Sequence, residues 1–137
     1  MHNLGYEHTH IGILSQNYTS GKILTVTRKE KEILTKIKEG EKPMSFSCYL
    51  LPKGYKVASF GYDFLCERNN SYISVVIKEI DYNSCNEQLI ISLLRKYIRF
   101  EYGGVYSTSE SEMPLLYAET KDKNNLKTYK LIRKIEK

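Results

Sequence analysis

Residues 22–46 read KILTVTRKEKEILTKIKEGEKPMSF, and this stretch decides the fold class. Its apolar residues recur at helical spacing at Ile33, Leu34 and Ile37. Thr27 and Glu30 have the capping-box spacing that starts a helix, and Gly40 is typical of a helix end. The stretch therefore predicts a strand, a short amphipathic helix over residues 28–39 and a second strand.

A second helix is predicted at roughly residues 85–101. Ser84 and Glu87 again have the capping-box spacing. The apolar residues that follow share one helical face and are Leu89, Ile90, Leu93, Leu94, Tyr97 and Ile98. Gly103 and Gly104 then end the pattern.

Most of the remaining chain has the composition of strands, which are expected at 6–14, 22–27, 45–51, 57–67, 72–81, 115–120 and 127–135. Residues 68–71 and 121–125 are predicted hairpin loops. The order ββαβββαββ predicts an α+β fold, with a mostly antiparallel sheet or small β-barrel and two packed helices. A chain of 137 residues is expected to form one domain, 1–137.

The composition favours a cytoplasmic protein with no membrane partner. The N-terminus lacks the pattern of a signal peptide, and no apolar run reaches the ~18 residues of a membrane span. The three cysteines have no CxxC spacing, so we expect reduced and mostly buried thiols rather than a disulfide framework or a zinc ribbon. The Lys-, Ile-, Tyr- and Asn-rich composition is compatible with an AT-rich phage or mobile element.

A basic surface is the first functional indication. The net charge is +5, and the chain from Glu119 onward holds seven Lys or Arg residues against three acids. On the second predicted helix, Arg95, Lys96 and Arg99 leave the apolar stripe and are expected to face solvent. Such a ridge is able to contact phosphates, although a solvated helix face is the more common explanation of such a pattern. Twelve tyrosines suit sheet packing or stacking on bases.

Residues 22–82 resemble the ASCH/PUA-like domains. The likeness rests on the strand, short helix and Gly40-Glu41-Lys42 turn of the opening stretch, and on KGYKVASF and SYISVVIKEIDYN further along. The resemblance implies a small pseudobarrel that binds RNA or a modified nucleoside, with Lys42 near the ligand. An ordinary helix stop followed by Pro43 is the alternative explanation of this turn.

His8 and His10 are the candidate catalytic and metal-binding residues. On a continuous strand they would share a face, about 7 Å apart, and both imidazoles would reach one divalent cation. The His-x-His pattern resembles the metal-binding motif of the HUH endonucleases, which implies a tyrosine nucleophile, for which Tyr117 is the candidate. A third ligand would have to be a carboxylate such as Glu7, Asp63 or Asp81.

Three functions follow from these features. The favoured one is a small non-enzymatic protein that binds nucleic acid, RNA above all, or a phosphorylated nucleotide through a basic face that includes Lys42, Arg95, Lys96 and Arg99. It needs no cofactor. The first alternative is a metal-dependent phosphodiesterase or nuclease that uses His8 and His10. The second is an inhibitor or immunity protein whose partner is another protein.

Overall fold

The chain divides into two compact units, which are described separately. The computed structural model describes residues 5–16, 23–55, 60–116, 118 and 127–136. The first unit consists of Met1–Gly54 and Tyr62–Ile77, and the second of Tyr55–Gly61 and Lys78–Lys137. The single domain expected from chain length stays a prediction.

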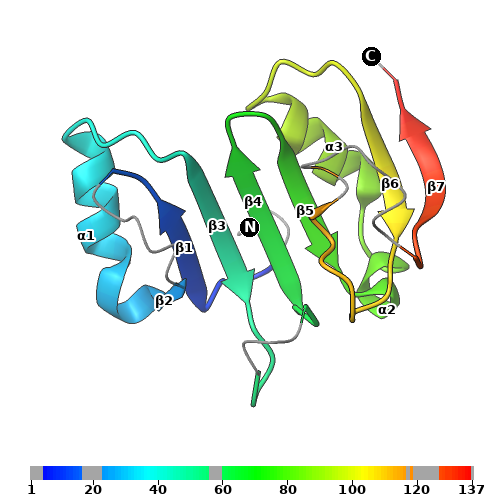
Figure 1. Ribbon diagram of the computed structural model, residues 1–137, viewed down its shortest axis with the longest axis horizontal. Coiled ribbons are helices and arrows are strands. Elements are labelled where there is room, and N and C mark those ends of the chain that lie inside the picture. Colours follow the sequence, from blue (N-terminus) through cyan, green and yellow to red (C-terminus); the bar gives the residue numbers. More distant parts are fainter. Residues whose placement is uncertain (1–4, 17–22, 56–59, 117, 119–126, 137) are drawn as a thin grey trace. The chain divides into compact units, whose positions relative to one another are not determined.

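The first unit is built on a five-stranded antiparallel sheet (Figure 1). Its elements are β1 (His10–Leu14), β2 (Ile23–Thr25), α1 (Val26–Lys38), β3 (Ser45–Leu50), β4 (Phe64–Asn69) and β5 (Ile73–Ile77). The strand order is β2-β1-β3-β4-β5, and every neighbouring pair is antiparallel. The predicted hairpin between the last two strands is confirmed, and Asn69 Oδ1 accepts hydrogen bonds from the Ser71 and Tyr72 amides in its loop.

The core of this unit lies between α1 and one face of the sheet. Strand alternation places Ile11 and Ile13 on the same face, where they pack against Ile33 of the helix. Less buried apolar side chains surround these three, namely Leu24, Val26, Ile37, Phe46 and Cys48. The apolar stripe read from the sequence is therefore the face that α1 buries.

The start of α1 differs from the predicted capping box. The helix begins at Val26, directly after β2, and within the described part of the chain the Thr25 side chain makes no capping bond. The Val26 amide instead donates to the Thr9 carbonyl, so the sheet determines where the helix starts. At the other end the prediction is confirmed, because the helix stops at Lys38 and Gly40 adopts a φ of 104°, which favours glycine.

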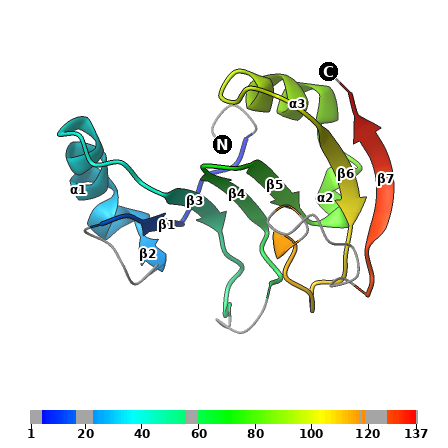
Figure 2. The same cartoon turned by 45° about the horizontal axis from the view of Figure 1, so that its top comes forward.

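The second unit holds two helices and a two-stranded antiparallel sheet (Figure 2). Its elements are α2 (Glu79–Tyr82), α3 (Glu87–Arg95), β6 (Gly103–Ser107) and β7 (Lys130–Ile135). A β-bulge interrupts the β6–β7 pairing between Val105 and Tyr106. The strand predicted over 115–120 is wrong where the structure describes it, since Leu115 lies in a turn and Leu116 is helical. The partner of β7 is instead β6, whose first residues, Gly103 and Gly104, are predicted from the sequence to end a helix.

The second predicted helix is shorter than its apolar pattern suggested. It begins after Asn86, whose side chain accepts a hydrogen bond from the Leu89 amide at 3.0 Å, whereas the Ser84 hydroxyl donates to the Asp81 carbonyl. It ends at Arg95, because the following segment folds back to bring Phe100 beneath that guanidinium, 4.9 Å from the ring centroid. The end of α3 is therefore set by this tertiary contact and not by the periodicity of the apolar residues.

The fold class is α+β and mostly antiparallel, as predicted. The described order is ββαβββααββ: α2 is added before α3, where the fifth predicted strand is too long, and β6 takes the place of the strand predicted over 115–120. The five-stranded sheet is open, and no closed barrel forms within the residues that the structure describes. No helix in this part of the chain has the length and apolar character needed to cross a membrane.

One carboxylate connects the turn after β6 to the start of β7. Glu112 accepts hydrogen bonds from the Lys127 and Thr128 amides, at 2.8 and 3.0 Å. The hydroxyls of Thr128 and Thr108 also donate to it. These hydrogen bonds lower the pKa of Glu112 to about 2, because each donor favours the charged carboxylate. The bond from the Thr128 hydroxyl contributes most to this shift.

We expect this contact to make the β6–β7 hairpin sensitive to acid. A carboxyl group with a lowered folded-state pKa stabilises the fold above its unfolded pKa of about 4.3, and that stabilisation is lost as the pH falls toward 2. Glu112→Gln should therefore speed amide exchange at Lys127 and Thr128 at pH 7. The difference from the wild type should shrink below pH 3. Equal exchange in both proteins at pH 7 would show that the carboxylate does not hold the hairpin.

Candidate functional site

The two histidines do not form the predicted same-face pair. Regular pairing begins at His10, so His8 precedes β1 instead of lying within it. Strand alternation places His10 on the opposite face from Ile11, the residue that packs against α1. His8 turns toward α1 itself. The expectation of a shared face failed because the strand was assumed to start at residue 6.

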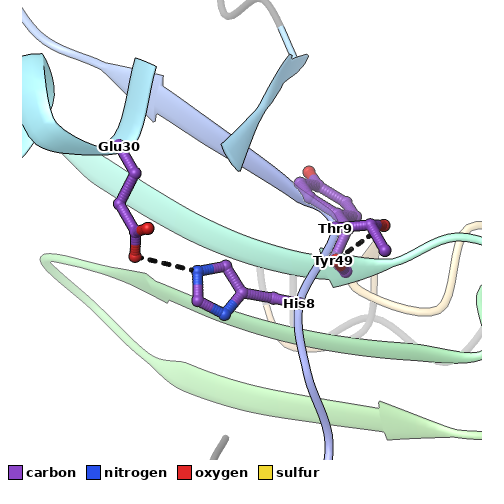
Figure 3. Close-up of polar contacts among 4 residues, drawn as sticks. All are labelled: His8, Thr9, Glu30 and Tyr49. Atoms are coloured by element: carbon purple, nitrogen blue, oxygen red, sulfur yellow. Dashed lines mark hydrogen bonds and ion pairs between the residues drawn. The ribbon is translucent and has the colours of Figure 1, made fainter. Parts of the chain in front are cut away.

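His8 contacts the carboxylate of Glu30, a residue that the sequence predicts to cap a helix (Figure 3). Its Nε2 lies 3.2 Å from Glu30 Oε1, and only 13% of the His8 side chain is exposed. The next residue, Thr9, directs its hydroxyl toward the Tyr49 carbonyl at 3.4 Å. These contacts fasten the N-terminal segment to α1 and β3, which is a structural role.

This geometry gives little support to the alternative hypothesis of a metal-dependent nuclease that uses His8 and His10. His10 Nδ1 lies 2.9 Å from the hydroxyl of Thr9, its neighbour in the chain. Across the described residues no three His, Cys, Asp or Glu side chains are placed to hold one metal ion. The acidic partner of His8 in this contact is Glu30, which is not among the carboxylates suggested from the sequence. Tyr117, the candidate nucleophile, lies outside the described residues.

A second polar cluster lies on the sheet face opposite α1. Glu67 of β4 accepts hydrogen bonds from the Ser47 hydroxyl at 3.0 Å and from the Tyr72 hydroxyl at 2.7 Å. Each carboxylate oxygen thus has a donor, and Ser47 is only 4% exposed. The arrangement satisfies buried polar groups and links β3 and β4 to the end of the β4–β5 loop. Sequence reasoning missed it because the three residues meet only through strand register.

The predicted ligand residues fall into both units. Lys42 is exposed in the first unit, between α1 and β3. Arg95, Lys96 and Arg99 are exposed in the second. Their expected common helical ridge is wrong, because α3 ends at Arg95 and Arg99 lies beyond it. They come instead from the last helical residue and the segment that follows.

The fold joins these cations to the end of β7. An Arg95 guanidinium nitrogen donates to the Glu136 carbonyl, and the guanidinium lies over the Phe100 ring. That ring rests against the start of β6, since a Cβ added to Gly103 would lie 2.9 Å from its Cε2 atom. Lys134, paired with Gly104, lies two residues before Glu136 and is exposed. The C-terminal ends of α3 and β7 therefore meet at one end of the second unit.

We call this region the cationic end and define it by Arg95, Lys96, Tyr97, Arg99, Tyr102 and Lys134. Tyr97 is 67% exposed and Tyr102 is 56% exposed, although both have large apolar rings. Among the described residues, Lys96, Arg99 and Lys134 have no acidic partner. Exposed aromatic rings interleaved with available cations are characteristic of surfaces that bind single-stranded nucleic acid.

A neighbouring arginine has a structural role by contrast. Arg133 forms an ion pair with Glu87 at the start of α3, and the Tyr82 hydroxyl donates to the same carboxylate. Because Arg133 and Lys134 are adjacent in β7, their side chains point to opposite faces of the hairpin. Arg133 thus ties α3 to β7, while Lys134 leaves the opposite face of the hairpin at the same end of the unit as the end of α3.

Comparison with known proteins adds no relative to this description. No protein-family model matches the chain, and no similar protein was found among curated sequences or among solved structures. The resemblances to ASCH/PUA-like domains and to HUH endonucleases stay predictions.

Proposed function

We propose that the chain is a non-enzymatic protein that binds single-stranded nucleic acid, RNA in particular, through the cationic end of its second unit. The observation that carries the proposal is the joining of α3 to the end of β7 through Arg95 and Glu136. This contact brings Lys134 to the same end of the unit as Lys96 and Arg99, which come from a segment more than thirty residues away in sequence.

One feature, the pair of exposed tyrosines, favours a single strand over a duplex. Tyr97 and Tyr102 are both more than half exposed, and unpaired bases stack on exposed aromatic rings with a contribution of about 1–3 kcal/mol each. A duplex keeps its bases stacked internally and would leave both tyrosines unused. Cations beside the rings neutralise the backbone phosphates, which supply much of the affinity and all of its salt dependence.

RNA is preferred to DNA on the strength of the resemblance over residues 22–82. That likeness implies an RNA or modified-nucleoside ligand with Lys42 near it, and Lys42 is exposed in the first unit. A phosphorylated nucleotide would use the same phosphate contacts at the cationic end. It would use fewer of them, so we expect it to bind more weakly.

A salt series tests the proposal. Anisotropy of a labelled RNA of about 12 nucleotides should report binding that weakens steeply between about 0.05 and 0.3 M salt. Each phosphate contact to a single strand contributes about −0.7 to the slope of log affinity against log salt. Three or four contacts predict a slope between about −2 and −3. No binding at the lowest salt, or binding with a slope near zero, would refute the proposal.

A further inference from the structure

Two of the three cysteines stand directly opposite each other in the centre of the five-stranded sheet. Cys48 of β3 pairs in register with Cys66 of β4, and the two strands are antiparallel neighbours. Directly opposed residues point their side chains to the same face of a sheet. Here it is the face covered by α1, because Cys48 packs against the Ile11, Ile13 and Ile33 core.

The spacing of opposed strand residues suits a covalent bond between the sulfur atoms. Cα atoms of such a pair lie about 4.5–5.5 Å apart, within the 4.4–6.8 Å range that disulfides span. The next residues in the same row are Ile11 on β1 and Val75 on β5, so apolar neighbours flank the pair on both sides. Both thiols are free and half-buried.

We propose that Cys48 and Cys66 are a reversible dithiol modification site, which a low-molecular-weight disulfide such as oxidised glutathione converts to a cross-strand disulfide. One cysteine, as its thiolate, attacks a sulfur of the small disulfide, whose S–S bond breaks and releases one small thiol. The second cysteine loses its proton and attacks the protein sulfur of this mixed disulfide, which expels the second small thiol. Two protein thiols are thereby oxidised and one small disulfide is reduced to two thiols.

The surroundings of the pair set the rate of this exchange. Burial, together with the neighbouring Cys66, raises the pKa of Cys48 to about 11, and burial also raises the pKa of Cys66. Both groups are therefore mainly protonated at neutral pH, and the reactive thiolate is scarce. The exchange should be slow at pH 7 and should accelerate about tenfold for each unit of pH up to 9.

The bond would fix the pairing of two central strands. It would close the loop between β3 and β4, and cross-links of loops this size restrict the unfolded chain substantially. We expect the melting temperature of the oxidised protein to exceed that of the reduced protein by roughly 5–10 °C. Oxidation is thus expected to stabilise the first unit.

The test uses the full chain with Cys85→Ser, which removes the one cysteine outside the pair and leaves the core intact. After incubation with oxidised glutathione, we expect the intact mass to fall by two hydrogens and peptide mapping to find Cys48 linked to Cys66. Dithiothreitol should reverse both changes. The wild-type chain should give the same linked peptide.

Two outcomes would overturn the proposal. One is a glutathione adduct that persists on Cys48 or Cys66 without closing to the linked peptide. The other is the absence of any change in mass after prolonged incubation at pH 9. Neither result depends on RNA binding, so the proposal for the cysteine pair and the proposed function can be refuted independently of each other.

Discussion

Replacing Lys96, Arg99 and Lys134 together with glutamine is expected to weaken binding of a single-stranded RNA about 100-fold at 0.1 M salt. The three residues are exposed, and within the described chain they have no acidic partner to neutralise them. One phosphate contact to a single strand releases about 0.7 of a counterion, which corresponds to roughly fivefold in affinity at 0.1 M. Three such contacts multiply to the expected loss, measurable by anisotropy of a labelled RNA.

A matched control removes the same charge from the first unit. Lys31, Lys38 and Lys53 are also exposed, so their replacement with glutamine lowers the net charge equally. We expect this control to change affinity by no more than about twofold to threefold, because long-range attraction between exposed charges is screened. Equal losses in the two triple variants would show that net charge, and not the cationic end, determines binding.

Phe64→Ala is expected to lower the free energy of unfolding by about 3–5 kcal/mol. Phe64 has an exposed fraction of 0% and lies at the start of β4. Its ring stacks on that of Tyr6, with the centroids 4.3 Å apart and the planes at 29°. The substitution removes this aromatic contact and leaves a cavity that neighbouring side chains fill only partly. Urea denaturation followed by circular dichroism measures the change.

The control for this prediction is an aromatic residue on the surface. Tyr97 is 67% exposed, and Tyr97→Ala should change the free energy of unfolding by no more than about 0.5 kcal/mol. A loss below about 1 kcal/mol for Phe64→Ala would mean that the N-terminal segment does not pack on β4 as described. A large loss confined to Phe64→Ala would support the placement of Tyr6.

Local signals predicted much of the first unit. The apolar stripe of α1 and its end at Gly40 depend on residues within a few positions of one another, and the sequence reading placed both correctly. The loop between β4 and β5 was equally readable, because Asn69 supplies its own turn bonds. The α+β class followed from these elements and their order.

Long-range contacts set the features that the sequence did not reveal. β6 and β7 are separated by more than twenty residues, and the pairing of Gly103 with Ile135 has no local signature. The end of α3 depends on Phe100 returning beneath Arg95. Glu30 has the spacing of a capping-box residue, but its carboxylate instead contacts His8, which lies in a distant segment of the chain. In each case a tertiary partner prevailed over a short-range preference.

Most residues of the candidate site could be predicted from the sequence, but their arrangement in space could not. The basic residues near Arg95 are evident in the sequence. Their position at the same end of the unit as Lys134 depends on the contact between α3 and the end of β7, which the sequence does not show. The histidine hypothesis failed for a related reason. β1 begins at His10, four residues after the predicted start at residue 6, so the prediction extended the strand through His8 and put both histidines on one face.

The most direct test of the account is photo-crosslinking of the full chain to a short single-stranded RNA that carries photoreactive uridines, followed by peptide mapping. We predict crosslinks in the peptides that contain Tyr97 and Tyr102, with their yield reduced in the Lys96→Gln, Arg99→Gln, Lys134→Gln variant. Crosslinks confined to the first unit, between Ile23 and Lys53, would contradict it.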